Sequence, residues 1–246
     1  MRDLILSDIH ANWEALEAVV ARAAGSYDRI VCCGDLIGYG PDPNRVLDWA
    51  RSNVQFVVRG NHDKAAVGLE NLEWFNPVAR TAALWTLNEL TPENFEYTKG
   101  LPKGPLSIDK YQIAHGSPLD EDEYVVGESD AEQAFAYLDR DVAFFGHTHV
   151  QGGFALIRRR VRELEGPVPE SLEATLDLDP DAAYLINPGS IGQPRDRDPR
   201  AAWALYDTES RRVTYYREPY DIETVQAKIR RAALPDVLAD RLAVGQ

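Results

Sequence analysis

Every histidine in this 246-residue chain belongs to a short polar motif that follows an apolar run. The motifs are Asp8-Ile9-His10, Gly60-Asn61-His62-Asp63, His115-Gly116-Ser117 and Gly146-His147-Thr148-His149, and all the histidines but His115 lie within two residues of an aspartate, asparagine or another histidine. A further motif of the same shape, Gly34-Asp35, carries only a carboxylate. Proteins bind transition metals through imidazole nitrogens and carboxylate oxygens that lie close together. The number of candidate ligands suits two metal ions better than one.

Two of the motifs place a pair of candidate ligands two residues apart. Asp8 and His10 face the same way if they end a strand, as do His147 and His149, so each pair can chelate a metal from one side. The remaining candidates are a carboxylate that could bridge two metals, an amide oxygen and a ring nitrogen, at Asp35, Asn61 and His115. This mixed set without a thiolate favours manganese, iron, zinc, nickel or cobalt over calcium or a structural zinc site.

Six short apolar runs must position these motifs, because each run ends where a polar motif begins. Their length and their β-branched or aromatic content are typical of buried strands. The runs are residues 4–6, 30–33, 56–58, 111–114, 142–145 and 184–186.

Helical patterns lie between the early runs. Asn12 is a predicted N-cap whose helix would end at Gly25, and Pro43 fits the first turn of a second helix. A third helix is predicted after Asn76-Pro77, with Ala79, Ala83, Leu84 and Leu87 as its apolar face, and a fourth over residues 131–138. Strands that alternate with helices predict an α/β sheet with parallel strands, and such sheets bind ligands beyond the carboxyl ends of the strands.

The second half of the chain has a different pattern. Residues 153–161 and 203–216 are predicted strands, the latter a hairpin that turns at residues 207–210. The acidic, proline-containing residues 163–182 are predicted to form an exposed excursion or hairpin arm. Residues 222–244 predict a helical tail broken at Pro235. Without a clear linker, residues 1–246 are interpreted as one domain.

The charge and the cysteines limit the classes of partner. With 26 basic and 40 acidic residues the net charge is −14, so non-specific nucleic-acid binding is not expected. A small anionic substrate stays possible, because bound divalent cations dominate the local field. Cys32 and Cys33 are interpreted as buried thiols in a reducing compartment. No signal peptide or membrane span is recognised, so a cytoplasmic location is expected, with the oligomeric state left open.

Taken together, the histidine motifs resemble the calcineurin-like metallophosphoesterases. That family carries Asp-x-His, Gly-Asp, Gly-Asn-His-Asp/Glu, a lone His and Gly-His-x-His in this order, and residues 8–149 contain every block. Residues 187–195 resemble the closing motif of the small bacterial and archaeal phosphodiesterase branch. The resemblance implies a four-layer αββα sandwich: two mixed β-sheets flanked by helices, with a dinuclear metal site at the C-terminal ends of the strands.

The resemblance also implies a role for each motif residue. Asp35 would bridge two divalent metal ions, with manganese favoured. The three ligands of one metal would be Asp8, His10 and His149, and those of the other would be Asn61, His115 and His147. A hydroxide shared by the metals would attack phosphorus. His62 would be the catalytic residue that faces the substrate, stabilising charge or protonating the leaving oxygen.

Two positions depart from the phosphoprotein-phosphatase branch of the family. There the Gly-Asp block continues to a second aspartate and then an arginine, whereas this chain has Gly38 and Tyr39. This difference argues against protein phosphatase activity and leaves open what orients His62. Arg59 and Arg195 could supply the missing positive charge. Alternatively, Arg59 is a surface residue and Arg195 pairs with acidic neighbours.

Other candidate substrate contacts follow the same motifs. Tyr39 and Asn44 lie in a loop after Asp35 and could contact substrate or only shape the loop. Residues 189–192 could offer backbone N–H groups to a phosphate or could form only a tight turn. Trp74 and Phe75 follow His62 and could line a pocket.

These observations leave three hypotheses about function. The leading one is metal-dependent hydrolysis of a small phosphodiester. The nearest alternative is a nucleotide phosphatase or dinucleoside-polyphosphate hydrolase, which would use the same metals and His62. The third is a non-catalytic, metal-binding scaffold, which the intact ligand set and His62 argue against.

Overall fold

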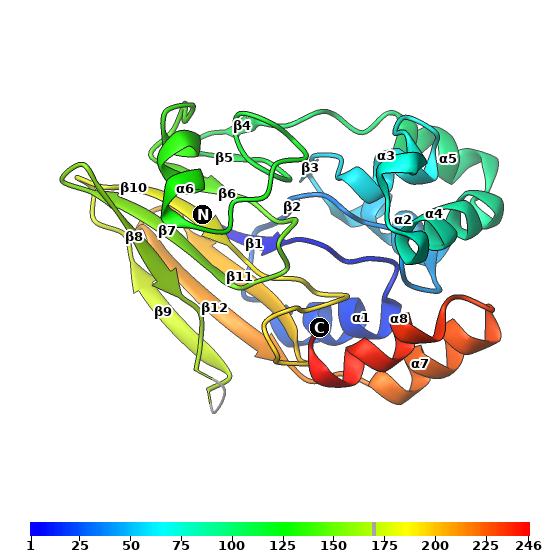
Figure 1. The fold of residues 1–246 in the computed structure, drawn as a ribbon. Coiled ribbons are helices and arrows are strands. Elements are labelled where there is room, and N and C mark those ends of the chain that lie inside the picture. The colour runs from blue at the N-terminus through cyan, green and yellow to red at the C-terminus, as the bar shows by residue number, and fades with distance from the viewer. Residues whose placement is uncertain (169–170) are drawn as a thin grey trace.

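Two six-stranded β-sheets pack face to face in the computed structural model, which describes residues 1–168 and 171–246 (Figure 1). The first sheet has the order β3 (Phe56–Val57), β2 (Arg29–Cys32), β1 (Arg2–Leu6), β11 (Ala201–Asp207), β12 (Arg212–Glu218) and β9 (Glu173–Asp177). The second has the order β4 (Leu106–Ile108), β5 (Tyr111–Ile113), β6 (Val142–Phe144), β10 (Ala183–Asn187), β7 (Gly152–Ile157) and β8 (Arg160–Glu165).

The six apolar runs of the sequence are all strands, which confirms that prediction. Three of them, β1, β2 and β3, lie side by side in parallel in the first sheet. The other three, β5, β6 and β10, do the same in the second sheet. The remaining strands pair antiparallel, so both sheets are mixed. Each sheet therefore contributes three parallel strands whose carboxyl ends carry polar motifs.

Helices cover the outer faces of the two sheets. Helices α1 (Trp13–Ala23) and α2 (Pro43–Asn53) pack on the first sheet, and α6 (Glu128–Phe135) packs on the second. As predicted, Asn12 caps α1, since its side-chain oxygen accepts a bond of 3.2 Å from Ala15 N. Apolar side chains of both sheets fill the layer between them, including Ile5, Tyr111 and Tyr206. The predicted four-layer αββα arrangement is confirmed.

The other helices gather near the polar motifs. They are α3 (Asn61–Ala66), η1 (Leu72–Trp74), α4 (Pro77–Glu89), α5 (Pro92–Lys99), α7 (Ile222–Arg231), α8 (Asp236–Asp240) and η2 (Arg241–Val244). The α8 helix follows Pro235, at the break expected in the helical tail. Side chains of α4, α7, α8 and η2 form one apolar cluster around Tyr39. The C-terminal helices thus fix the loop that follows Asp35.

The predicted apolar face of α4 is right for Ala79 and Ala83, which are buried, and wrong for Leu84. Leu84 is 42% exposed, and the buried positions are Ala79, Ala82, Ala83 and Thr86. Small side chains let α4 lie close against its neighbours, whereas a search for large apolar residues selects the leucines. The face that packs was therefore decided by side-chain size.

The acidic stretch of residues 163–182 joins the two sheets. It contains the end of β8, an edge strand of the second sheet, and all of β9, an edge strand of the first (Figure 1). Residues 169 and 170 of this stretch lie outside the described residues. The alternating exposure of β9 is typical of a strand that packs on one face only. This segment thus links the sheets at edges that lie away from the polar motifs.

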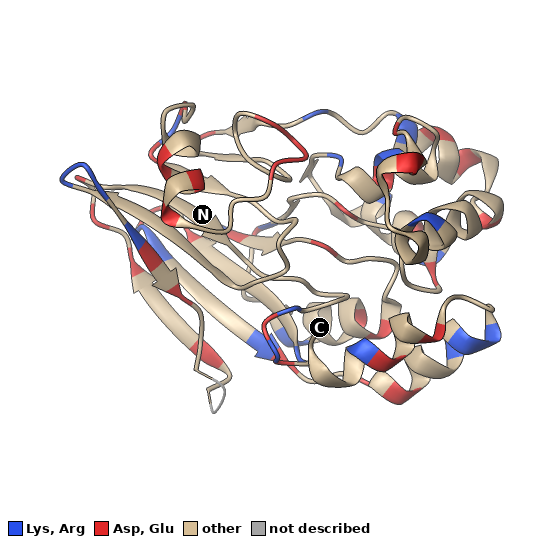
Figure 2. Cartoon of the chain, viewed as in Figure 1, with Lys and Arg blue, Asp and Glu red and all other residues tan. Residues whose placement is uncertain are grey.

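Charges of both signs are interspersed along the outer helices and edge strands (Figure 2). In the part of the chain that the structure describes, no helix is both long enough and apolar enough to cross a bilayer.

Candidate metal centre

The carboxyl ends of the parallel strands bring all seven predicted metal ligands together. Asp8, His10, Asp35 and His149 offer ligand atoms within 4.8 Å of one another, and so do Asp35, His115 and His147. Asn61 joins the second group, because its Oδ1 lies 3.1 Å from His115 Nε2. Asp35 belongs to both groups. The arrangement is therefore that of two adjacent sites with one shared carboxylate.

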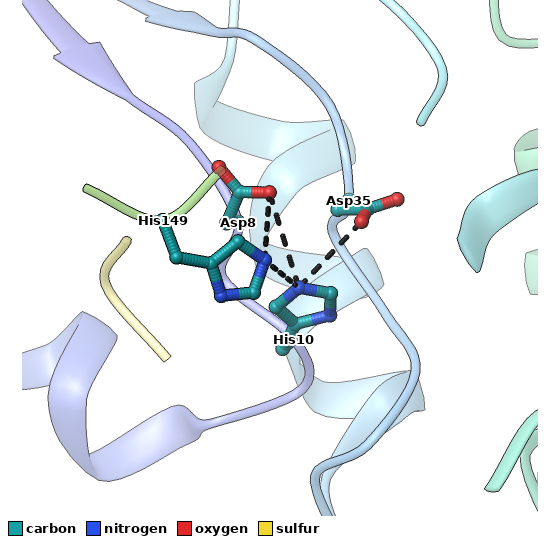
Figure 3. Close-up of side chains that lie close together, drawn as sticks. All are labelled: Asp8, His10, Asp35 and His149. Carbon is teal, nitrogen blue, oxygen red and sulfur yellow. Dashed lines mark hydrogen bonds and ion pairs between the residues drawn. The ribbon is translucent and has the colours of Figure 1, made fainter. Parts of the chain in front are cut away.

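The first group is held by the loops after β1, β2 and β6. Nε2 of His10 lies 3.0 Å from Nε2 of His149 and 3.5 Å from Oδ2 of Asp35. Nε2 of His149 is 3.3 Å from Oδ1 of Asp8. Figure 3 shows the four side chains close together, with dashed lines from His10 to each of the other three. All four side chains are buried.

The second group lies on the other side of Asp35. Nε2 of His115 is 3.1 Å from Nδ1 of His147 and 3.4 Å from Oδ2 of Asp35. Burial lowers the pKa of His115, but the charges of Asp35 and Asp8 and the hydrogen bonds to Asp35 and Cys33 together raise the pKa to about 10. The carboxylates of the cluster therefore attract positive charge.

The outer nitrogens of three ligand rings are fixed by backbone carbonyls. Nδ1 of His10 bonds Ile37 O at 3.2 Å, Nδ1 of His115 bonds Cys33 O at 2.9 Å and Nδ1 of His149 bonds Gln193 O at 2.6 Å. A ring that donates from Nδ1 turns the lone pair of Nε2 into the cluster, as in protein metal sites.

The donor set fits divalent metal ions. With Nδ1 protonated, the Nε2 atoms of His10 and His149 face each other as two acceptors. Within the described residues, Oδ2 of Asp35 and Nε2 of His147 are buried without a hydrogen-bond partner. Such groups are costly unless a cation satisfies them.

The backbone at the site is strained. A positive φ angle is uncommon for residues other than glycine, and it persists where the surroundings enforce it, often at functional sites. Six site residues adopt it: Asp8 (51°), His10 (49°), Asp35 (53°), Tyr39 (59°), His147 (67°) and His149 (61°). Two glycines permit close approach, because a Cβ at Gly60 would overlap the Asp35 carboxylate and one at Gly146 would overlap Ser7 and Asp8.

His62 lies beside the cluster and is held by aromatic rings. Its ring centroid is 4.2 Å from that of Tyr39, 5.1 Å from His10 and 5.4 Å from Phe75. A Cβ at Gly38 would lie 2.9 Å from His62 Nδ1, so the glycine that departs from the phosphatase pattern makes room for this ring. Burial lowers the pKa of His62 to about 4, which leaves the ring neutral at neutral pH.

Arg195 and Tyr39, two predicted substrate contacts, lie next to His62. The Arg195 guanidinium is 5.9 Å from the Tyr39 ring centroid. Burial lowers the pKa of both His62 and His149, and the charge of Arg195 lowers each of them further. The acidic neighbours of Arg195 bind elsewhere, since Asp196 pairs with Arg217. Arg195 is therefore available at the cluster.

The structure does not bring Asn44 and Arg59 to the cluster. The Asn44 amide donates to Glu89 O at 2.7 Å and accepts from Thr91 N at 3.0 Å, so it joins α2 to the segment between α4 and α5. Arg59 forms a bidentate ion pair with Glu121 at 3.0 and 2.9 Å. Both side chains are engaged in contacts that support the fold, and we do not retain them as substrate contacts.

Three residues of the site were given no role of their own in the sequence analysis. Tyr124 stacks on His147 with ring centroids 3.8 Å apart, and Gln193 accepts from His149. Asp63 accepts bonds from Gly60 N at 2.9 Å and Ile37 N at 3.2 Å, which ties the start of α3 to the loop after Asp35. Of the three, only Asp63 could have been recognised in the sequence, because it stands three residues after Gly60, at the capping position of a helix start.

A cavity of about 310 Å³ opens next to the cluster. Its lining includes the side chains of Tyr39, Asn61, His62, Glu70, Trp74, Asp122, Tyr124 and His147. A larger cavity of about 430 Å³ elsewhere has none of the seven candidate ligands in its lining. The smaller cavity is therefore the candidate substrate site.

An αββα sandwich with clustered aspartate and histidine ligands at its strand ends defines the class of metallophosphoesterases. This chain belongs to the calcineurin-like phosphoesterase superfamily, whose domain model matches residues 1–211. Membership supports metal-dependent hydrolysis of phosphate esters.

Similar proteins come from archaea and bacteria. The chain is 34% identical to the uncharacterised protein MJ0912 of Methanocaldococcus jannaschii, over 98% of this chain and 97% of the other. It is 38% identical to a metallophosphoesterase from Sphaerobacter thermophilus, with a TM-score of 0.86 over 100% and 99% of the two chains. A hypothetical protein from Pyrococcus horikoshii, PH1004, shares the fold at 19% identity, with a TM-score of 0.78 over 100% and 98%.

Proposed function

We propose that this protein hydrolyses a small phosphodiester at the Asp35 cluster, with His62 acting on the substrate. One observation carries the proposal: a neutral, buried histidine lines a cavity of about 310 Å³ together with two candidate metal ligands, Asn61 and His147. A cavity of this size suits a small molecule.

We assign three ligands to each metal and Asp35 to both. Asp8, His10 and His149 would hold one ion, and Asn61, His115 and His147 would hold the other. When bound, divalent ions supply positive charge to phosphate oxygens and lower the pKa of water. Manganese is the ion we propose first, with iron, zinc, nickel or cobalt as alternatives, because the donors are nitrogen and oxygen atoms.

The chain's own residues would orient the ester and stabilise its developing charge. A neutral His62 ring donates one N–H, which can bond a phosphate oxygen or assist the leaving oxygen. Arg195 adds a fixed positive charge beside it. Tyr39 packs against the His62 ring, and Gly38 leaves room for that ring.

A diester is preferred over a monoester on charge. The carboxylates of Glu70 and Asp122 line the cavity and share one amine, Lys64, as their ion-pair partner. The remaining negative charge disfavours a dianionic monoester more than a singly charged diester. Gly38 and Tyr39 also replace the aspartate and arginine of the phosphoprotein-phosphatase pattern.

A nucleotide phosphatase or dinucleoside-polyphosphate hydrolase is the second candidate, and Trp74 favours it. This side chain is 84% exposed and lines the cavity. An exposed indole offers a face on which a base can stack, worth about 1–3 kcal/mol. If a base stacks there, Trp74→Ala should weaken the binding of a nucleotide ester. The binding of a methyl ester of the same phosphate should not change.

The test is an assay of the purified chain, stripped of metal and resupplied with Mn²⁺. Bis(p-nitrophenyl) phosphate and p-nitrophenyl phosphate are compared at equal concentration. Metal-dependent turnover with a preference for the diester supports the proposal. Preference for the monoester moves the assignment to nucleotide phosphatases. Bound metal without turnover of either ester rejects an enzyme and favours a scaffold.

A further inference from the structure

Two arginines from distant parts of the chain converge on one amide oxygen beside the cluster. Oε1 of Gln193 accepts from Nη2 of Arg195 at 3.1 Å and from Nη1 of Arg241 at 3.3 Å. In the described residues, Nε of each arginine is buried without a hydrogen-bond partner, and the nearby Asp196 and Asp198 pair with Arg217 and Arg200 instead. Like charges placed together without an anion are destabilising.

This arginine pair lies beside the metal-ligand cluster, outside the lining of the cavity of about 310 Å³. The carbonyl of Gln193 bonds His149, a candidate metal ligand, while its amide bonds the two arginines. Tyr39 also lies close to both guanidiniums, since each of them lowers its pKa against a larger rise from burial. Gln193 thus connects the pair to His149, and Arg195 lies 5.9 Å from the Tyr39 ring that contacts His62.

Contacts other than those of Arg241 also anchor the C-terminal segment. Gly245 O accepts from Arg197 N at 2.9 Å, and Leu238 and Leu242 pack into the apolar cluster around Tyr39. Burial first and the charge of Arg195 second lower the pKa of Arg241, so its charge is unfavourably placed in the protein alone. An anion between the guanidiniums would remove that cost.

We propose that Arg195 and Arg241 form a subsite for a second anionic group, a phosphate or a carboxylate, on the substrate whose phosphodiester is cleaved. The inference rests on the proposed function. It assigns the substrate class: a phosphodiester that carries a further negative charge outside the ester bond. Two guanidinium groups can bind such a group through several charge-assisted hydrogen bonds.

Calorimetry on the Mn²⁺-loaded protein tests the subsite with three ligands of similar size. Propylphosphonate carries one anionic group, whereas 3-phosphonopropionate adds a carboxylate and propane-1,3-diphosphonate adds a second phosphonate. The wild type should bind at least one doubly anionic ligand about tenfold tighter than propylphosphonate. In Arg241→Gln this advantage should fall below about threefold. Of the two doubly anionic ligands, the one with the larger advantage over propylphosphonate identifies the second group as a phosphate or a carboxylate.

The matched control is Arg231→Gln, which removes the same charge from an exposed position in the same C-terminal segment. It should keep the full advantage. No advantage in the wild type, or an equal advantage in Arg241→Gln, overturns the subsite. Metal content is measured after each titration, and Arg241→Met, which also removes the charge but keeps a long side chain, replaces Arg241→Gln if that variant does not fold.

Hydrolysis of bis(p-nitrophenyl) phosphate by the same wild-type samples separates the two proposals. Turnover without a ligand advantage rejects the subsite and leaves the proposed function in place. A ligand advantage without turnover rejects the function and leaves an anion-binding site at the arginine pair.

Discussion

At the scale of single residues, His62 is held by ring contacts with Tyr39, His10 and Phe75. Its Nδ1 has no hydrogen-bond partner among the described residues, so no carboxylate orients the ring. We expect His62→Ala to lower kcat by about 10²–10⁴-fold, the usual contribution of a general acid–base group. Metal content should not change, since His62 is not a ligand. Steady-state kinetics with elemental analysis checks both. If the His62→Ala variant turned over substrate at the wild-type rate, His62 would have no role in the reaction.

Gly38 is the second residue on which the His62 position depends. Its φ of +90° is unfavourable for other residues, and a Cβ there would meet His62 at 2.9 Å. We expect Gly38→Ala to lower both kcat and the free energy of unfolding, the latter by about 1–2 kcal/mol.

Gly68→Ala is the matched control for Gly38→Ala. Gly68 also has a positive φ, +72°, but a Cβ there meets nothing within 4 Å. It should lower stability by a similar amount and keep kcat. Equal loss of kcat in both variants would mean that the clash with His62 is not the cause.

Asp35 is the residue that both ligand groups share. We expect Asp35→Asn to reduce the affinity for both metal ions together, because a neutral amide replaces the central negative charge. Titration of the metal-free protein with Mn²⁺, followed by calorimetry, measures the affinity and the number of ions bound. Loss of one ion with the other unchanged would contradict the bridging role.

At the scale of elements, the strand ends need loops that are tied to one another. The Asp63 carboxylate does this for α3 and the Asp35 loop, since it accepts from Gly60 N and Ile37 N. We expect Asp63→Ala to lower the free energy of unfolding by about 1–2 kcal/mol and to weaken metal binding as well. Denaturant titration and calorimetry report the two effects separately.

Asp130 provides the control for Asp63, because it makes a similar cap at the start of α6. It accepts from Val126 N at 3.0 Å and from Gly127 N at 3.1 Å, and α6 packs on the outer face of the second sheet. Asp130→Ala should cost stability and leave metal affinity unchanged. If Asp63→Ala also leaves metal affinity unchanged, its tie to the Asp35 loop is not needed for the site.

At the scale of the whole molecule, the ligands come from loops of both sheets, with Asp8 and Asp35 from the first and His115 and His147 from the second. Bound metal would therefore join the sheets. Free metal at about 100 times its dissociation constant adds about 2.7 kcal/mol per site. We expect Tm to fall by several degrees when a chelator removes the metal and to recover with Mn²⁺, as followed by calorimetry. An unchanged Tm after verified metal loss would contradict this link.

Much of the site could be predicted because its signals are local. Each parallel strand is a short apolar run, and the polar residues that follow it in the chain necessarily lie at its carboxyl end. The capping residue Asn12 and the helix-starting Pro43 are local in the same sense. By contrast, Asn44 follows Asp35 closely in sequence, yet α2 directs it toward Glu89 and Thr91. Proximity in the chain does not give the direction of a side chain.

The sequence by itself determined the candidate ligands, the strands that carry them and the family, because these depend on residue type and short spacing. Only the tertiary structure decided which side chains complete the site. Tyr124 against His147, Gly38 beneath His62, and Arg241 next to Arg195 are contacts between residues far apart in the chain or across a turn. Such contacts arise from how the sheets and the C-terminal helices pack, and packing depends on the shapes of many side chains at once.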